Sequence, residues 1–164
     1  MRIPVICSMH DLDKIDCEIL TLLQQDSSMS VKEIAQKVGL SATPTYERIK
    51  FMETSGIIKH YSAILDRDKI GLKLVAYCNI TLKEQSGKAL ADFEKATAKL
   101  PEIMEVISLS GRYDYMLKIV ANDITSYNEF VVSKLSNIPN IGQYHSNIVM
   151  SMPKHETSYP VKTK

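Results

Sequence analysis

The sequence has few cysteines, and those it has form no recognisable pattern. Cys7, Cys17 and Cys78 are odd in number and far apart, with no C-x-x-C spacing. A disulfide framework needs paired cysteines and a zinc-thiolate site needs closely spaced ones, so we expect neither. Long apolar runs are also absent: no window reaches the roughly 18 residues of a membrane-spanning helix. With no signal-peptide core readable either, we expect a cytoplasmic protein with no membrane partner.

A strong net charge is missing as well. The 164 residues include 20 Lys and Arg against 19 Asp and Glu, which gives a net charge of +1. Residues 1–60 carry 7 basic and 8 acidic side chains, a net charge of −1. A strongly basic domain would itself indicate phosphate binding, so any nucleic-acid function here must rest on where individual residues lie.

The common catalytic motifs do not occur. The sequence contains no G-x-S-x-G, no phosphate-binding P-loop and no G-x-G-x-x-G. Its four histidines share no metal-ligand spacing, and they are His10, His60, His145 and His155. His155-Glu156 has no second histidine four residues on, so it is not a zinc-protease motif. The sequence therefore predicts no enzyme, no metal and no cofactor.

Residues 13–56 repeat their apolar side chains at helical spacing and predict three helices. Asp13 is expected to cap the first helix, and Ser30-Val-Lys-Glu33 is a capping box for the second. Gly39 is expected to end the second helix, because only glycine enters the left-handed conformation cheaply. Ser41 is expected to cap the third. The inner face of that helix is assigned to Tyr46, Ile49 and Met52.

Residues 31–50 have the layout of a helix-turn-helix, whose second helix enters the major groove of DNA. The outward residues of that helix are expected to be Ala42, Thr43, Thr45, Arg48 and Lys50. Arg48 could form a bidentate hydrogen bond with a guanine or a phosphate, and Lys50 could form an ion pair with the DNA backbone. A plain helical bundle used for packing or protein contact would show the same spacing, so this alternative stays open.

After Gly56 the apolar period changes from 3.6 to 2. Residues 57–65 predict a strand, followed by a polar turn. The order from residue 74 onward is strand, helix, strand, strand, helix, strand, which is typical of ferredoxin-like domains. We expect an α+β fold with a helix-turn-helix domain at 11–64, a linker at 65–71, a ferredoxin-like βαββαβ domain at 72–153 and a polar tail at 154–164. One face of the sheet would be wet unless it paired with a second copy, so we expect at least a dimer.

Several motifs, in order along the chain, resemble those of the Lrp/AsnC, or feast/famine, transcriptional regulators. They include Leu12-Asp-Lys-Ile-Asp16, Val38-Gly-Leu-Ser41, Thr43-Pro44, Gly56-Ile-Ile58, Gly111-Arg-Tyr-Asp114 and Ile138-Pro-Asn-Ile141. The likeness runs from about residue 11 to residue 153 and is strongest to the leucine-responsive branch. It implies a winged-helix DNA-binding domain, a ferredoxin-like effector (RAM) domain, double-stranded DNA as partner, and dimers that assemble further, often to octamers.

The resemblance also implies site residues. On the DNA-reading helix they are Ser41, Thr43, Pro44, Arg48 and Lys50. The effector would be an amino acid, with Gly111, Tyr113 and Asp114 on its loop and Ile148 and Val149 on the last strand opposite that loop. The chemistry of an amino acid extends this to the whole segment of Ser110, Gly111, Arg112, Tyr113 and Asp114, which could offer backbone amides to the carboxylate and Asp114 to the ammonium group. The apolar side chains of Ile148 and Val149 suit leucine or methionine. Phe51 and Arg112 depart from the family pattern, since a basic and an acidic residue are common there.

Two alternative functions remain open from the sequence. Some proteins of this two-part architecture resemble the family yet decarboxylate tetrapyrroles, and Arg112 and His145 are the candidate pocket residues for that reaction. A ligand-sensing module that acts on proteins, without binding DNA, is the other alternative.

Overall fold

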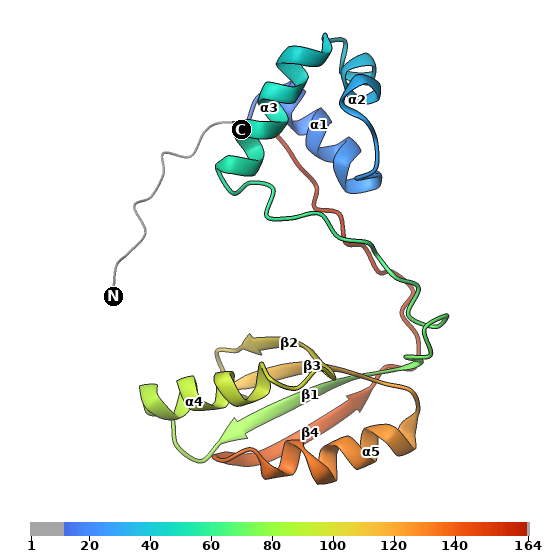
Figure 1. Cartoon of the computed structure of the whole chain (residues 1–164). Helices are drawn as coiled ribbons and strands as arrows, with labels where there is room; N and C mark the ends of the chain where they lie inside the picture. Colours follow the sequence, from blue (N-terminus) through green and yellow to red (C-terminus); the bar gives the residue numbers. More distant parts are fainter. Residues whose placement is uncertain (1–11, 164) are drawn as a thin grey trace. The chain divides into compact units, whose positions relative to one another are not determined.

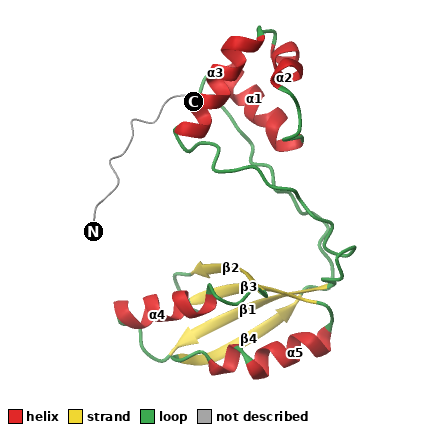
Figure 2. Ribbon diagram, viewed as in Figure 1, coloured by secondary structure: helices red, strands yellow, loops and turns green. Residues whose placement is uncertain are grey.

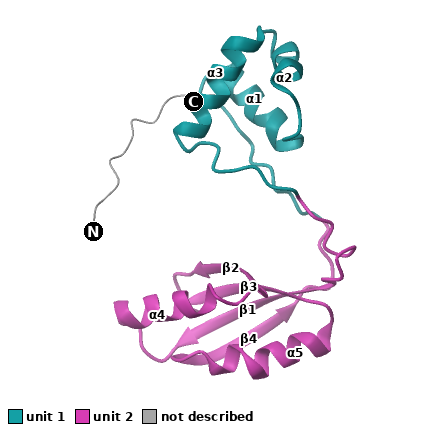
Figure 3. Cartoon of the chain, in the orientation of Figure 1, with its two compact units in different colours: residues 1–63, 154–164 teal, residues 64–153 magenta. Residues whose placement is uncertain are grey.

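The computed structural model describes residues 12–163 and contains helices α1 to α5, a short 3-10 helix and strands β1 to β4 (Figure 1). Cys7, His10, the predicted domain start at residue 11 and the last residue, Lys164, lie outside the described residues. The described strands all fall between residues 74 and 148 (Figure 2). The chain divides into two compact units (Figure 3). Residues up to 63 and from 154 onward form the helical unit, and residues 64–153 form the sheet unit.

The helical unit contains α1 (Lys14–Gln25), α2 (Val31–Val38) and α3 (Ala42–Thr54). Two predicted caps are confirmed: Asp13 accepts a hydrogen bond from the Asp16 amide, and Ser30 accepts one from the Glu33 amide. Ser41 is the N-cap residue of α3, as predicted, but its side chain makes no capping hydrogen bond. The buried core of the unit consists of Ile19, Leu20, Ile34, Ile49 and Met52.

The predicted strand at residues 57–65 is wrong. Within residues 12–63 the structure contains helices and loops but no strand. Ile57, Tyr61, Ile64 and Leu65 are exposed, the last two by 68% and 65%. The alternating pattern is present in the sequence, but a strand also needs a neighbouring backbone to pair with. The segment finds no such partner within the described part of its own chain.

The sheet unit confirms the βαββαβ order. Its elements are β1 (Leu74–Leu82), α4 (Gly87–Thr97), β2 (Ile103–Ser108), β3 (Tyr115–Ala121), α5 (Ile124–Ser133), the 3-10 helix η1 (Leu135–Asn137) and β4 (Ile141–Ile148). The strands lie in the order β2-β3-β1-β4 and every pair is antiparallel. This order places the β2–β3 loop and the start of β4 at the same end of β1.

Helices α4 and α5 pack on one face of the sheet. The alternate β1 residues Ala76, Cys78, Ile80 and Leu82 form a buried cluster with aromatic side chains of both helices, among them Phe93 and Phe130. Each fully buried branched side chain contributes about 1.5–3 kcal/mol to folding. The intervening residues Tyr77, Asn79 and Thr81 lie on the other face and are half-buried. No helix among residues 12–163 is long and apolar enough to span a bilayer.

Candidate DNA interface and effector loop

The turn between α2 and α3 is set by Gly39. Its φ of +70° is left-handed, and the following amide, that of Leu40, donates to the Ala35 carbonyl over 2.9 Å. Both features are those of a glycine C-cap. In place of a side-chain cap on α3, the Ser41 carbonyl accepts a hydrogen bond from the Thr45 hydroxyl at 2.9 Å. The sharp turn and short helices predicted from the sequence are therefore present.

The face of α3 that points outward differs from the predicted one. Thr45 is completely buried, so its prediction as an outward, DNA-contacting residue is wrong. Tyr46, predicted to lie inside, is 55% exposed. The buried residues are Thr45, Ile49 and Met52, at positions i, i+4 and i+7. The exposed stripe, also at helical spacing, consists of Thr43, Tyr46, Glu47 and Lys50. Of the other predicted contact residues, Ser41 is exposed, and Ala42 and Pro44 are half-buried.

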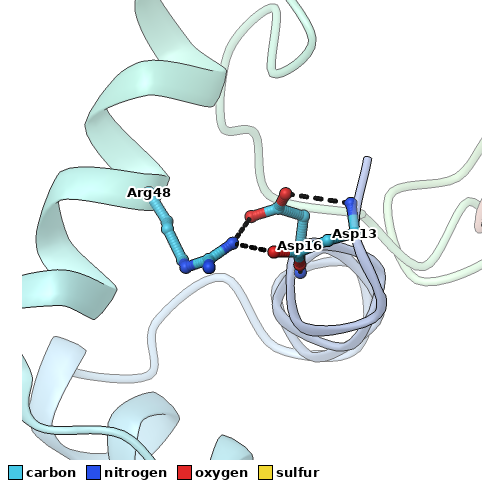
Figure 4. Close-up of polar contacts among 3 residues, drawn as sticks. All are labelled: Asp13, Asp16 and Arg48. Carbon is cyan, nitrogen blue, oxygen red and sulfur yellow. Dashed lines mark hydrogen bonds and ion pairs between the residues drawn. The ribbon is translucent and has the colours of Figure 1, made fainter. Parts of the chain in front are cut away.

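Arg48 contacts α1, although the sequence predicted that it would point outward. One guanidinium nitrogen, Nη1, donates to Asp13 Oδ2 at 2.6 Å and to Asp16 Oδ1 at 2.7 Å (Figure 4). The other oxygens of the two carboxylates accept backbone amides, because Asp13 and Asp16 form a reciprocal capping box. Hydrogen bonds to Asp16 and then to Asp13 raise the pKa of Arg48, which stays charged. The start of α1 is thereby tied to the middle of α3.

Lys50 is exposed, and its ammonium group lies 3.3 Å from the Glu53 carboxylate one turn later on the same helix. Such a surface pair is worth less than about 1 kcal/mol and exchanges readily for another anion. Lys50 therefore remains available to a phosphate, whereas the Arg48 guanidinium is occupied by two carboxylates.

The Asp13–Asp16–Arg48 cluster predicts an acid-sensitive helical unit. The hydrogen bond from the Asp16 amide, and then Arg48, hold the pKa of Asp13 below its ordinary value of 3.8. A lowered folded-state pKa means that the stabilisation is present above that ordinary value and is lost as the pH falls through the folded value. We expect the unfolding free energy to drop between about pH 5 and pH 2, and Asp13→Asn to flatten that drop. Denaturant unfolding at several pH values measures this free energy. If it fell as steeply with pH in the variant as in the wild type, Asp13 would not be a source of the acid sensitivity.

The predicted effector loop connects β2 to β3, and Asp114 holds it against the end of β1. One Asp114 carboxylate oxygen accepts the Leu82 amide at 2.7 Å, and the other accepts the Gln85 side-chain amide at 2.8 Å. The Asp114 amide itself donates to the Ile80 carbonyl at 2.9 Å. Both carboxylate oxygens are thus engaged within the chain, and the loop between Leu109 and Asp114 is closed by a backbone hydrogen bond of 2.9 Å.

The remaining loop residues are open to solvent. Ser110, Gly111 and Arg112 are exposed, and Gly111 has a φ of +127° that favours glycine. The Arg112 guanidinium lies 5.5 Å from the centre of the Tyr113 ring, and that ring lies 5.7 Å from the His145 ring. Arg112 and His145, the candidate residues for a tetrapyrrole pocket, thus both contact Tyr113 on an exposed surface.

The structure does not bring Ile148 and Val149 to this loop within one chain. Ile148 pairs with Ala76, and the Val149 amide donates to the Val75 carbonyl, whereas the loop meets β1 at Ile80. At about 3.3 Å per residue, the two ends lie roughly 13 Å apart along β1. The expectation that these residues lie opposite the loop is therefore wrong for a single chain. The β4 residue that meets the loop is His145.

Asn140, part of the Ile138-Pro-Asn-Ile141 motif, supports the same end of the sheet, a role that was not assigned to it from the sequence. It takes a φ of +73°, and its side-chain amide accepts from the Glu84 amide and donates to the Glu84 carbonyl, both at 2.8 Å. This asparagine fixes the chain between β1 and α4, next to Gln85, which holds Asp114. Its position after Pro139 signals a turn, but only the fold reveals which segment it holds.

The fold and the exposed α3 stripe define a helix-turn-helix protein with a ferredoxin-like second unit. Residues 12–59 match the winged helix-turn-helix DNA-binding family model, and residues 75–159 match the Lrp/AsnC ligand-binding domain model. This chain belongs to the Lrp/AsnC family, as the sequence motifs indicated.

The relatives are named transcriptional regulators. The chain is 34% identical over 151 residues to the DNA-binding transcriptional activator DecR of Escherichia coli, covering 92% of this chain and 99% of that protein. It is 34% identical to the leucine-responsive regulatory protein of Klebsiella pneumoniae, covering 94% of each chain. Among solved structures, the L-Met complex of the Neisseria meningitidis regulator NMB0573 has a TM-score of 0.87 at 31% identity, over 91% of this chain and 96% of that one.

Proposed function

We propose that this chain is a sequence-specific DNA-binding transcriptional regulator whose DNA affinity or assembly is tuned by a small amino acid. The observation that carries the proposal is the exposed stripe of α3 on a helix-turn-helix, in a chain whose second unit matches a ligand-binding domain. The relatives named as DNA-binding and leucine-responsive regulators support it. Acting on DNA, it would work in the cytoplasm.

In this proposal, the surface that faces DNA consists of Ser41, Thr43, Pro44, Tyr46, Glu47 and Lys50. Small polar side chains at the start of α3 suit close approach to base edges, and Lys50 suits a phosphate. Arg48 has an indirect role in this proposal. It does not contact DNA, and its two ion pairs hold α3 in position against α1. Tyr46 adds an exposed aromatic ring whose hydroxyl can donate or accept a hydrogen bond.

Replacing Lys50 with Gln is expected to lower the salt dependence of DNA binding. Each phosphate that a cationic side chain neutralises adds about 0.9 to the slope of log K against log salt, so the slope should fall by about that amount. Lys99→Gln is the matched control, since Lys99 is also exposed but lies in the sheet unit. Fluorescence anisotropy at several salt concentrations measures both variants. Equal slopes in the two would remove Lys50 from the interface.

We propose a homodimer as the basic assembly, built further into larger oligomers. One support is the sheet face opposite the helices, where apolar and polar side chains are half-buried. The other is the exposed apolar side chains of Ile64, Leu65 and Ile70. A helix-turn-helix dimer presents its recognition helices about one helical turn of DNA apart, roughly 34–36 Å or a multiple. We expect the chain to sediment as a dimer or larger at micromolar concentration, and a monomer would contradict this part of the proposal.

For the effector, leucine or methionine is favoured. The related regulator NMB0573 was solved as a complex with L-Met, and other relatives are named leucine-responsive. A thermal-shift panel of the twenty amino acids tests this directly. A ligand at 100 times its dissociation constant should stabilise the native state by about 2.7 kcal/mol. No stabilisation by any of the twenty would exclude a free amino acid as effector.

A further inference from the structure

The tail that the sequence predicts as a polar extension belongs structurally to the helical unit. Residues from 154 onward group with residues up to 63, while residues 64–153 form the other unit. The chain therefore passes between the units twice, once after Ala63 and once after Pro153. Most chain ends are ordered only when specific contacts tie them down, so the contacts of this tail call for a physical explanation.

Gln24, near the end of α1, holds the tail through its backbone. Its side-chain oxygen accepts the Tyr159 amide at 2.7 Å, and its side-chain nitrogen donates to the Tyr159 carbonyl at 3.1 Å. An amide side chain that hydrogen-bonds to both the N–H and the C=O of one residue resembles the paired hydrogen bonds between two strands. It therefore fixes which tail residue lies beside Gln24. The Tyr159 side chain is 82% exposed and plays no part in this contact.

Two neighbours of Tyr159 assist the docking. Pro160 restricts the residue before it to extended backbone, which reduces the entropy cost of fixing the tail. Val161 is half-buried and packs against the core of the helical unit. With Lys162 and Thr163 it forms one wall of a groove of about 780 Å³, and Cys17 and Leu22 of α1 lie in the facing wall.

The groove lies away from the proposed DNA-reading face. Its α1 lining residues follow one helical stripe, Lys14, Glu18, Thr21 and Gln25, and Val38 closes it at the end of α2. None of the described residues that line it belongs to α3. A tail bound there leaves Thr43, Tyr46 and Lys50 uncovered.

We propose that residues 154–163 form an intramolecular strap that docks on the helical unit, where Gln24 of α1 holds the Tyr159 backbone and Val161 packs against the core beside the groove. The DNA-reading unit is then joined to the sheet unit by two covalent routes, the segment that follows α3 and the strap that follows β4. A helical unit held at two points has less freedom than one on a single linker. The strap starts a few residues beyond Val149, so it connects the end of β4 to α1 by a stretch of chain separate from the first linker.

Lysine cross-linking tests the strap without DNA or amino acid, so its failure is separate from failure of the proposed function. Lys14 and Lys162 both line the groove, and an amine-reactive cross-linker should join them in the full-length protein. Tyr159→Pro removes the N–H group that donates a hydrogen bond to Gln24. Gln24→Ala removes both hydrogen bonds between Gln24 and Tyr159. We expect each to reduce the Lys14–Lys162 product at least five-fold. Tyr159→Ala keeps the backbone groups and should leave the yield unchanged.

Two further readouts decide the outcome. In a mixture of ¹⁴N- and ¹⁵N-labelled protein, an intramolecular strap gives cross-linked peptides of one isotope only, whereas mixed pairs would show that the tail docks on another chain and would overturn the proposal. Deleting residues 154–164 should speed thiol labelling of Cys17, mapped by mass spectrometry, at least ten-fold, because it removes the wall that Val161, Lys162 and Thr163 form opposite Cys17. Unchanged labelling, or equal cross-linking in all variants, would also overturn it.

Discussion

Replacing Arg48 with Met is expected to destabilise the helical unit by about 3 kcal/mol, because it leaves the carboxylate of Asp16 without its cation. The Asp16 side chain is only 11% exposed, so water replaces the missing guanidinium poorly. DNA affinity should fall with stability, since α3 is then no longer tied to α1. Calorimetry of the full chain gives the stability of this unit, and DNA titration gives the affinity.

A compensating variant separates the two possible roles of Arg48. With Asp13→Asn and Asp16→Asn added to Arg48→Met, no uncompensated charge remains and much of the stability should return. DNA affinity should recover with it if Arg48 only positions α3. If Arg48→Met leaves stability unchanged but abolishes DNA binding, Arg48 reads DNA directly, and the ion pairs with Asp13 and Asp16 are not its main role.

Replacing Asp114 with Ala is expected to abolish the response to the amino-acid effector while leaving DNA affinity within a few-fold. The substitution deprives the Leu82 amide of its acceptor, at a cost of about 1–3 kcal/mol, and releases the loop that carries Gly111 to Tyr113. The proposed DNA-contacting residues lie in the other unit. Titrating effector against DNA-bound protein measures the response.

Asp114→Asn is the informative control. Asparagine keeps an acceptor for the Leu82 amide, and the Gln85 amide can rotate to meet its nitrogen, so the loop keeps its shape without the charge. We expect this variant to retain most of the response, because both carboxylate oxygens already serve the chain itself. A complete loss in a folded Asp114→Asn variant would mean that the carboxylate binds the effector's ammonium group. An unchanged midpoint in Asp114→Ala would place the site elsewhere.

Features set by local chemistry were predictable from the sequence. The capping residues Asp13 and Ser30 each accept a hydrogen bond from the expected backbone amide, because a cap depends on residues three positions away. Gly39 takes the left-handed conformation for the same local reason. The alternation from residue 74 onward indicated the strand β1, since side chains of a strand repeat every two residues, but it left open which of the two faces is buried.

Features set by tertiary contacts could not be predicted from the sequence. Thr45 looks polar in sequence, yet its hydroxyl is satisfied by the Ser41 carbonyl and the rest of the side chain packs inside. Arg48 meets carboxylates 32 and 35 residues earlier, and periodicity holds no information on that pairing. The capping box at Asp13 and Asp16 was a partial signal, because two neighbouring carboxylates attract a cation from an adjacent helix.

In the sheet unit, too, local features could be predicted from the sequence and tertiary contacts could not. Asp114 was identified from its loop motif, but its partners Leu82 and Gln85 lie on and just after β1, which only the strand order brings close. Ile148 and Val149 failed as loop neighbours because the register of β4 on β1 decides which end of the sheet they occupy.

An affinity titration on DNA selected by the protein itself tests the proposed regulator most directly. Full-length protein is used to enrich binding sequences from a random duplex library, and the enriched duplex is titrated with and without each amino acid. We predict a paired-site sequence that wild type binds and a Tyr46→Ala, Lys50→Gln variant binds at least ten-fold more weakly. We also predict a shift of about 5-fold or more with leucine or methionine, the usual range of allosteric coupling. Failure to enrich any sequence, or an affinity that no amino acid alters, would contradict an effector-tuned DNA-binding regulator.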